Sequence, residues 1–513
     1  MMTKFLLIYG VNFLITQDFN SSEYWKSLSS HLGGVYPYYN LEEPDSFTLD
    51  FSEILSSRKA SNLAIELDET ALVTKMCIPF LIGDRTLIQG VSKTPWVSNY
   101  KGKGRWVPHY LPPHGNLIPE KNAFTIKFKE ALLAEARDYI EGKKNIGILL
   151  SGGMDSRILA GVIRELQLTD RPEINVVCLT WGASDSRDVV YAQRIAQQFG
   201  WEIVHYPLSP ETLLRNIKFS GMHGAEFSAF HLHAMEDVAN TPNLDAILAG
   251  SYGDSVGRAE FSGSHVTKLK PVLPKILDTY GVLNSTSLQT AKRELRNDVI
   301  DSAHILQSTS VLRQREIEQE MHYMRRMLQA CMQTIAIKTP VYQLFTSPDV
   351  FGLMWGLDPE VRNNDWYALL LQQLPGELLN IPWARNGKLY HQQDKPALDN
   401  LSKSYHQYGK WLRSDLKQEV LNRLNSDAIR NLSIFNDKGL DRLIKNWEKA
   451  ITTGINSVDE SVVWLCSLHD MIEVYDISRT PISTQNSLVD TVRGCVGDLY
   501  ATTFIRARNI ARK

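Results

Sequence analysis

Hydrophobic and polar residues between positions 145 and 206 alternate in blocks that predict strands and helices in turn. The apolar run Ile146 to Leu150 stops at a polar turn, Ser151 to Ser156, and apolar residues return with helical spacing at 158, 159 and 162. A strand at 174–180, a helix at 188–199, a strand at 202–206 and a short strand at 246–249 follow. This β-α-β order predicts an α/β fold, a parallel sheet with helices on both faces.

The pattern also predicts a part on each side of the α/β unit. Short β-like runs at 5–15, 64–67 and 71–82 precede it, and a Gly-, Pro- and Trp-rich stretch ends near residue 122, before a predicted helix at 123–141. Beyond residue 284 the pattern is helical almost to the end. We therefore expect a β-rich domain at 1–122, the α/β domain at 123–415 and a helical C-terminal extension at 416–513.

Composition argues against several classes of protein. The 513 residues are 43% hydrophobic and 22% charged, with a formal net charge of -2, so we expect no nucleic-acid and no membrane partner. The five cysteines lie far apart without a C-x-x-C pair, which predicts reduced thiols and a cytoplasmic protein. Tyr9, Gly10 and Asn12 interrupt the apolar N-terminal stretch, which favours a buried strand over a signal peptide.

The turn at 151–156 has the composition of an anion site. Gly152 and Gly153 let the backbone turn sharply and approach a ligand, Ser151 and Ser156 add hydroxyl donors, and the start of the following helix offers free N–H groups. Asp155 would be repelled by a phosphate unless a cation lay between them, so we expect it to hold Mg²⁺ on a pyrophosphate. The alternative is an ordinary strand-to-helix turn with a serine N-cap.

A second strand runs into a similar turn at Leu248 to Ser255. Ligands of open α/β sheets lie beyond the carboxyl ends of adjacent strands, so Asp254 could share the metal with Asp155. The alternative for Asp254 is an Asx turn that closes a loop.

LLSGGMDS resembles the ATP-binding loop of the PP-loop ATP pyrophosphatases, and further segments make the chain similar to the asparagine synthetase superfamily. These segments are LTWG at 179–182, SRDVVYAQRIAQQFG at 186–200, LAGSYGDS at 248–255, KTPVYQLFTSPDVFGLMWGLDPEVR at 338–362 and LPGELLNIPWARNGK at 374–388. The resemblance extends from about residue 123 to about 415 and implies the adenine nucleotide alpha hydrolase-like fold, with ATP and Mg²⁺ as cofactors. By position it implies ATP contacts from Leu150, Ser151, Gly152, Gly153, Asp155, Ser156, Trp181, Ala249 and Gly250, and Mg²⁺ ligation by Asp155 and Asp254.

The chain departs from the family pattern in three places. Glutamine-dependent members begin with a cysteine nucleophile, but no cysteine precedes Cys77 here, so we expect no glutaminase activity and a degenerate, Ntn-like N-terminal layer. Ser251 stands where asparagine synthetase has a glutamate, and Tyr252 or Glu226 could replace that group. Trp383 stands where the family has a lysine that steadies pyrophosphate. The candidate catalytic substitutes are Arg385 and Lys388, weighed against surface charges.

Other polar residues carry weaker hypotheses. His223, His231 and His233 with Glu226 and Glu236 could form a metal cluster or line an acceptor pocket, although a solvated or core helix, with His233 and Asp237 on one face, is the default. Arg157 is expected to pack or form a salt bridge, near enough to the phosphates to help. Arg313, Arg315, Arg325 and Arg326 alternate with Glu316, Glu318 and Glu320, which predicts an exposed helical face.

These features together predict an ATP-dependent, AMP- and pyrophosphate-forming amide ligase. It would adenylate a small-molecule or peptide carboxylate for attack by ammonia or a substrate amine, with a homodimer left open as its assembly. The alternatives are an intramolecular amide cyclase, similar to lasso-peptide cyclases or β-lactam synthetases, an amidotransferase of a surface-polysaccharide pathway, and a non-catalytic nucleotide-binding scaffold.

Overall fold

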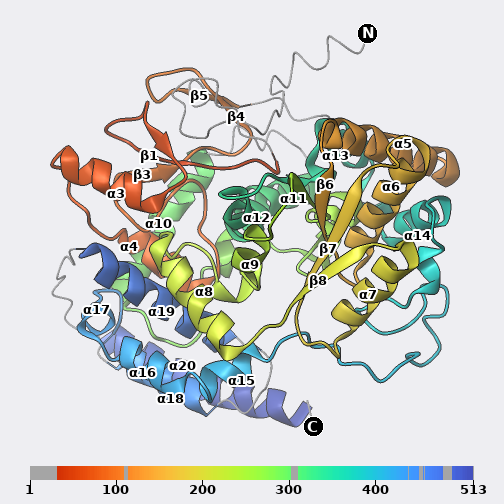
Figure 1. Cartoon of the computed structure of the whole chain (residues 1–513). Coiled ribbons are helices and arrows are strands. Elements are labelled where there is room, and N and C mark those ends of the chain that lie inside the picture. The colour runs from red at the N-terminus through yellow and green to blue at the C-terminus, as the bar shows by residue number, and fades with distance from the viewer. Residues whose placement is uncertain are drawn as a thin grey trace.

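A computed structural model describes residues 32–108, 114–301, 310–436, 438–449, 455, 457–477 and 488–511 of the chain. The strand expected at 5–15 lies outside these residues. Figure 1 shows the main sheet on one side of the molecule, a small N-terminal layer beside it, and a group of C-terminal helices below both.

The main sheet has five strands in the order β12-β9-β6-β7-β8, and every pairing in it is parallel. Its strands are β6 (Asn145–Leu149), β7 (Asn175–Trp181), β8 (Glu202–Tyr206), β9 (Ala246–Ala249) and β12 (Val341–Gln343). Ile148 on the central strand pairs with Cys178 on one side and with Leu248 on the other. The carboxyl ends of β6 and β9 therefore meet at one edge, and the α/β prediction is confirmed.

Helices cover both faces of this sheet because successive strand residues point to opposite sides. Ile148, Cys178 and Leu248 belong to a core that includes the buried sides of α5 (Lys121–Ile140), α6 (Met154–Thr169), α7 (Arg187–Phe199) and α14 (Asn364–Gln373). Leu149 and Ile247 belong to a second core with α9 (Met235–Ala239) and α12 (Gln329–Ala336). The helices expected at 123–141 and 188–199 thus match α5 and α7 to within two residues.

The N-terminal layer is small and only partly β. It contains an antiparallel sheet of β2 (Phe47–Thr48), β1 (Tyr38–Asn40) and β3 (Val91–Lys93), a pair of β4 (Ser98–Tyr100) and β5 (Trp106–Pro108), and the helices α3 (Phe51–Ala60) and α4 (Glu69–Cys77). The β-run expected at 71–82 is wrong, because α4 occupies most of it. The N-terminus of α4 is capped by Asp68, whose side chain accepts from the Ala71 N–H. The helix packs against α10 (Ser285–Asp301) and α19 (Ser457–Tyr475). At 64–67 the structure has only an isolated bridge between Leu67 and Ile88.

Helices dominate the chain beyond residue 284. They are α10 (Ser285–Asp301), α11 (Val311–Glu318), a π-helix at Gln319–Leu328, α13 (Pro348–Trp355), α15 (Tyr408–Arg413), α16 (Lys417–Leu424), α17 (Asp427–Arg430), α18 (Gly439–Glu448), α19 (Ser457–Tyr475) and α20 (Leu488–Ala511). α19 packs along α8 (Pro210–Met222), and one apolar core joins these helices to α3 and α4 of the N-terminal layer. No helix in the described parts of the chain combines the length and apolar character needed to cross a membrane.

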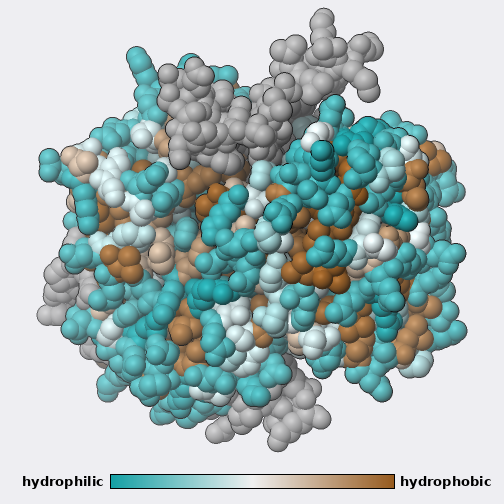
Figure 2. All heavy atoms as spheres, viewed as in Figure 1, coloured by the Kyte–Doolittle hydropathy of each residue, from teal (hydrophilic) through white to brown (hydrophobic). Residues whose placement is uncertain are grey.

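The exposed face expected for the charged segment before α12 is wrong for four of its residues, since Glu316, Glu320, Arg325 and Arg326 are buried. Three of the four pair with distant groups: Glu316 with Arg362 at 2.5 Å, Arg326 with Glu226 at 2.9 Å, and Arg325 with Asp84 at 2.7 Å. On the face of the molecule in Figure 2 the surface is mostly hydrophilic, with apolar residues in small groups, one of them over β7 and β8.

Candidate active site

The turn after β6 forms a compact loop held together by its own serines. The Ser151 and Ser156 hydroxyl groups lie 3.1 Å apart, the Ser156 hydroxyl donates to the Ser151 carbonyl, and the Gly153 N–H donates to the Ser151 hydroxyl. α6 then begins with Gly153 at its N-cap, and no side chain accepts from its first N–H groups. The alternative of a serine N-cap is therefore wrong. The N–H groups at the start of α6 have no side-chain acceptor, which suits the binding of an anion.

Neighbouring segments hold the loop in place. A Cβ atom on Gly152 would lie 2.7 Å from the Cβ of Ala384, so only glycine allows the 383–388 turn to approach this closely. The buried Arg157 guanidinium donates to the carbonyls of Gly152, Leu378, Ile381 and Pro382 at 2.7–3.0 Å. Arg157 thus positions the loop through its backbone rather than by reaching the phosphate side.

The turn after β9 packs directly against the phosphate loop. A Cβ on Gly250 would lie 2.9 Å from the backbone of Asp155, and one on Gly253 would lie 2.7 Å from the Asp155 side chain. Asp254 follows in a π-turn, Gly253–Gly257, where the Tyr367 hydroxyl donates to the Gly253 carbonyl at 2.5 Å. The two glycines therefore allow the two carboxylate-bearing turns to meet.

Asp155 and Asp254 share one electrostatic environment, with Arg258 beside them. Burial raises the pKa of both carboxyl groups; the Asp155 charge adds to this at Asp254 and brings its pKa to about 7, while the Arg258 cation opposes the rise in both. The Arg258 guanidinium lies 2.9 Å from the Asp155 carboxylate. Arg258 was not predicted as a site residue, although its position four residues after Asp254 was a usable signal.

The residues present fit a divalent cation held together with a nucleotide. Two neighbouring carboxylates in a desolvated site favour a cation, and Mg²⁺ commonly takes one or two carboxylates and completes its shell with phosphate oxygens and water. No group of three or more His, Cys, Asp or Glu residues that could hold a metal occurs in the described parts of the chain. Asp155 and Asp254 would therefore hold the ion only jointly with the substrate.

Only one of the two expected substitutes for the family lysine joins this cluster. The half-exposed Arg385 guanidinium lies 3.4 Å from Glu260 and over the Trp383 ring, and Glu260 in turn lies 3.9 Å from Arg258. The Lys388 ammonium instead donates to the Gln393 carbonyl at 2.6 Å.

The groups expected to replace the missing glutamate are separated. The Ser251 hydroxyl donates to Gln343 at 2.7 Å. Tyr252 lies beside it in a left-handed conformation with its hydroxyl buried and its pKa raised by burial. Glu226 forms its ion pair with Arg326 instead.

The three histidines do not converge on a metal. His233 has a left-handed backbone (φ 46°) outside any helix, so the helical face shared with Asp237 is wrong, and Asp237 pairs with Arg215. The His233 ring lies among aromatic rings, stacked with Trp181 at the end of β7 and with Tyr408. Burial lowers the pKa of His233 well below its usual range, so this part of the site is neutral and aromatic.

Comparison with known proteins gives a family match for the central part of the chain. Residues 127–336 match the family model described as asparagine synthase. No curated protein matches the chain. Among solved structures, the U34-tRNA thiolase NcsA from Methanococcus maripaludis is 12% identical with a TM-score of 0.25, covering 68% of this chain and 86% of that one. The NMN synthetase from Francisella tularensis is 11% identical with a TM-score of 0.21, covering 50% and 94%.

Proposed function

Because the chain carries an asparagine synthase domain over residues 127–336, we propose that it is an AMP-forming amide ligase. The domain supports an ATP-using, adenylating enzyme. The finer proposal is that the enzyme adenylates a substrate carboxylate for attack by ammonia or a substrate amine, without glutaminase activity of its own. The observation that carries it is the meeting of Asp155 and Asp254 beside the uncapped N-terminus of α6.

The named residues divide the work of the first chemical step. The backbone N–H groups at the start of α6 and the hydroxyl groups of Ser151 and Ser156 bind phosphate oxygens. Asp155 and Asp254 would hold Mg²⁺, which would supply positive charge to offset the negative charge of the pyrophosphate. Arg385 is the side chain we favour as the second cation for that charge, since its guanidinium joins the Glu260–Arg258 cluster. Trp181, Ala249 and Gly250, at the ends of β7 and β9, flank the loop as nucleotide contacts.

The proposal is tested with ATP labelled at the α-phosphate. The protein is incubated with Mg²⁺ and pools of small carboxylic acids or peptides, with and without ammonia, and AMP is measured. We expect AMP formation that depends on the carboxylate, is lost in Asp155→Asn and Asp254→Asn, and is retained in Asp138→Asn, a control on the exposed side of α5.

Three other results of this assay would change the proposal. AMP formation that survives in both site variants would refute the role given to the carboxylate pair. Tight ATP binding without AMP under every condition would favour the nucleotide-binding scaffold. AMP formation with a single substrate and no external amine, with loss of one water from the substrate mass, would identify an intramolecular cyclase.

A further inference from the structure

A small pocket lies between the N-terminal layer, the end of α8, the π-helix at Gln319–Leu328 and α12. It has a volume of about 40 Å³, room for roughly three water molecules. Its lining shares no residue with the phosphate loop or the Asp155–Asp254 pair. Its lining includes Lys93, Tyr38, Glu226, Arg325, Arg326 and Phe227.

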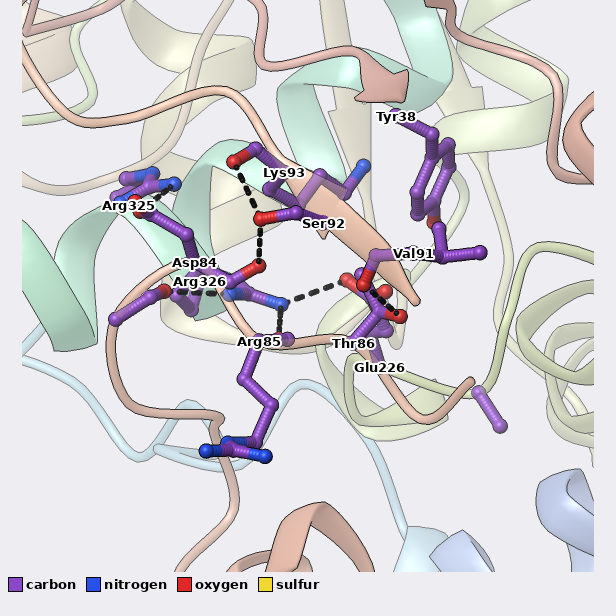
Figure 3. Close-up of polar contacts among 12 residues, drawn as sticks. Tyr38, Asp84, Arg85, Thr86, Val91, Ser92, Lys93, Glu226, Arg325 and Arg326 are labelled. Atoms are coloured by element: carbon purple, nitrogen blue, oxygen red, sulfur yellow. Dashed lines mark hydrogen bonds and ion pairs between the residues drawn. The ribbon is translucent and has the colours of Figure 1, made fainter. Parts of the chain in front are cut away.

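The Lys93 ammonium is the unusual group in this pocket. Lys93 ends β3, is only 7% exposed, and has its Nζ 3.4 Å from the centre of the Tyr38 ring. Figure 3 shows the side chain extending toward that ring. Within the described part of the chain the ring is the only partner of the ammonium, and no carboxylate lies within ion-pair distance. A buried ammonium without an acceptor is costly, and the pKa of Lys93 is accordingly lowered to about 7 by burial.

The surrounding charges leave the pocket positive. Arg325 pairs with Asp84 at 2.7 Å and Arg326 pairs with Glu226 at 2.9 Å, so both carboxylates are already engaged by guanidinium groups (Figure 3). The Nε and Nη1 atoms of the buried Arg325 have no hydrogen-bond partner. Below about pH 7, Lys93 therefore adds a positive charge that neither carboxylate compensates by direct contact.

We propose that this pocket binds a small monocarboxylate, with its oxygens at Lys93 and its short apolar part against Phe227 and neighbouring apolar side chains. The charge of the pocket requires an anion, and its volume limits that anion to a few heavy atoms. Apolar and aromatic lining residues, Leu49, Phe219, Phe227 and Ile337, favour a carboxylate with a short hydrocarbon body over an inorganic anion. Because its lining comes from both parts, a bound carboxylate would also bridge the N-terminal layer to the synthase domain.

Calorimetric titration of the full chain with propionate, in the absence of ATP, tests this site independently of the proposed enzyme activity. We expect one saturable site, and propionamide, which has the same shape without the charge, should bind at least tenfold more weakly. Lys93→Met removes the ammonium with little change in shape and should weaken propionate binding by about tenfold to a hundredfold, the range of a hydrogen bond to a charged group. Lys59→Met, an exposed lysine of α3, is the matched control and should bind as the unaltered protein does.

The comparison of propionate with propionamide uses the unaltered protein, so the proposal does not depend on the folding of Lys93→Met. Absence of saturable propionate binding, equal binding of propionamide, or unchanged affinity in Lys93→Met would each overturn the proposal. Loss of AMP formation without loss of propionate binding would instead count against the proposed function only.

Discussion

Replacing Arg157 by methionine should destabilise the fold and loosen the phosphate loop together. The guanidinium is 1% exposed and donates to four carbonyls, those of Gly152, Leu378, Ile381 and Pro382, at 2.7–3.0 Å. Burial lowers its pKa only to about 10, so it is charged at neutral pH. Methionine fills a similar volume but leaves these carbonyls without a donor.

The expected loss follows from two opposing terms. Each hydrogen bond from a charged donor contributes about 1.5 to 3 kcal/mol, and the variant loses four of them. In the opposite direction, the variant avoids the desolvation of a buried guanidinium, which costs the folded state several kcal/mol. We expect a net destabilisation of about 2 to 5 kcal/mol, because an orphaned buried acceptor is itself penalised by about 1 to 3 kcal/mol.

Urea unfolding followed by tryptophan fluorescence measures this loss. The control is Arg164→Met on the same helix, whose guanidinium has one hydrogen bond, to Gln167, and should cost less than about 1 kcal/mol. We also expect the KM for ATP to rise more than kcat falls, with partial rescue in Arg157→Lys. Equal destabilisation by Arg157→Met and Arg164→Met would refute the positioning role, as would an unchanged KM for ATP.

Three further changes test other parts of the structure. Gly253→Ala places a Cβ 2.7 Å from the Asp155 side chain and should lower the rate of AMP formation about a hundredfold; an unchanged rate would contradict the close packing of the two turns. Glu316→Gln leaves the buried Arg362 guanidinium without a counter-charge and should lower the free energy of unfolding in urea by about 3 to 5 kcal/mol. A loss of less than about 1 kcal/mol would contradict this. Burial lowers the pKa of Lys75 to about 7, against about 10.4 in an unfolded chain, so below about pH 7 the fold carries the cost of charging this amine, and stability recovers as pH rises toward about 10. Lys75→Met should therefore stabilise the fold most below about pH 7 and least at about pH 10, and a pH-independent effect would contradict this.

The local sequence pattern was sufficient to predict the structure wherever contacts between adjacent residues determine it. The strand, glycine turn and helix around Gly152 were predicted because apolar spacing and glycine placement are properties of adjacent residues. The β-run expected at 71–82 failed because its apolar residues fit a strand or a short helix equally well. The helix is favoured because Asp68 caps its N-terminus and because it packs against α10 and α19.

Charged residues were harder to place because their partners lie far away in the sequence. The alternating charges near Arg326 have the pattern of a solvated helix face. Arg326 is nevertheless buried, since Glu226, one hundred residues earlier in the chain, neutralises it, and the carbonyls of Gly83 and Arg85 accept from its guanidinium. Local composition contains no signal for such a pair. The same limit explains why Glu226 could be considered beside Ser251 when the fold assigns it to Arg326.

Arg258 explains how two acidic turns can meet before any nucleotide or metal is bound. Burial raises the pKa of Asp254 most, and repulsion from the Asp155 charge raises it further. The Arg258 guanidinium, 2.9 Å from Asp155, supplies the cation that opposes the rise in both carboxyl groups. A guanidinium placed there competes with a divalent ion for the same oxygens, but Glu260, 3.9 Å away, and the Asn364 side-chain oxygen, at 3.0 Å, offer it other partners. If the chain uses ATP and Mg²⁺ as proposed, Arg258 therefore balances the charge of the two carboxylates and has other partners when they bind the ion.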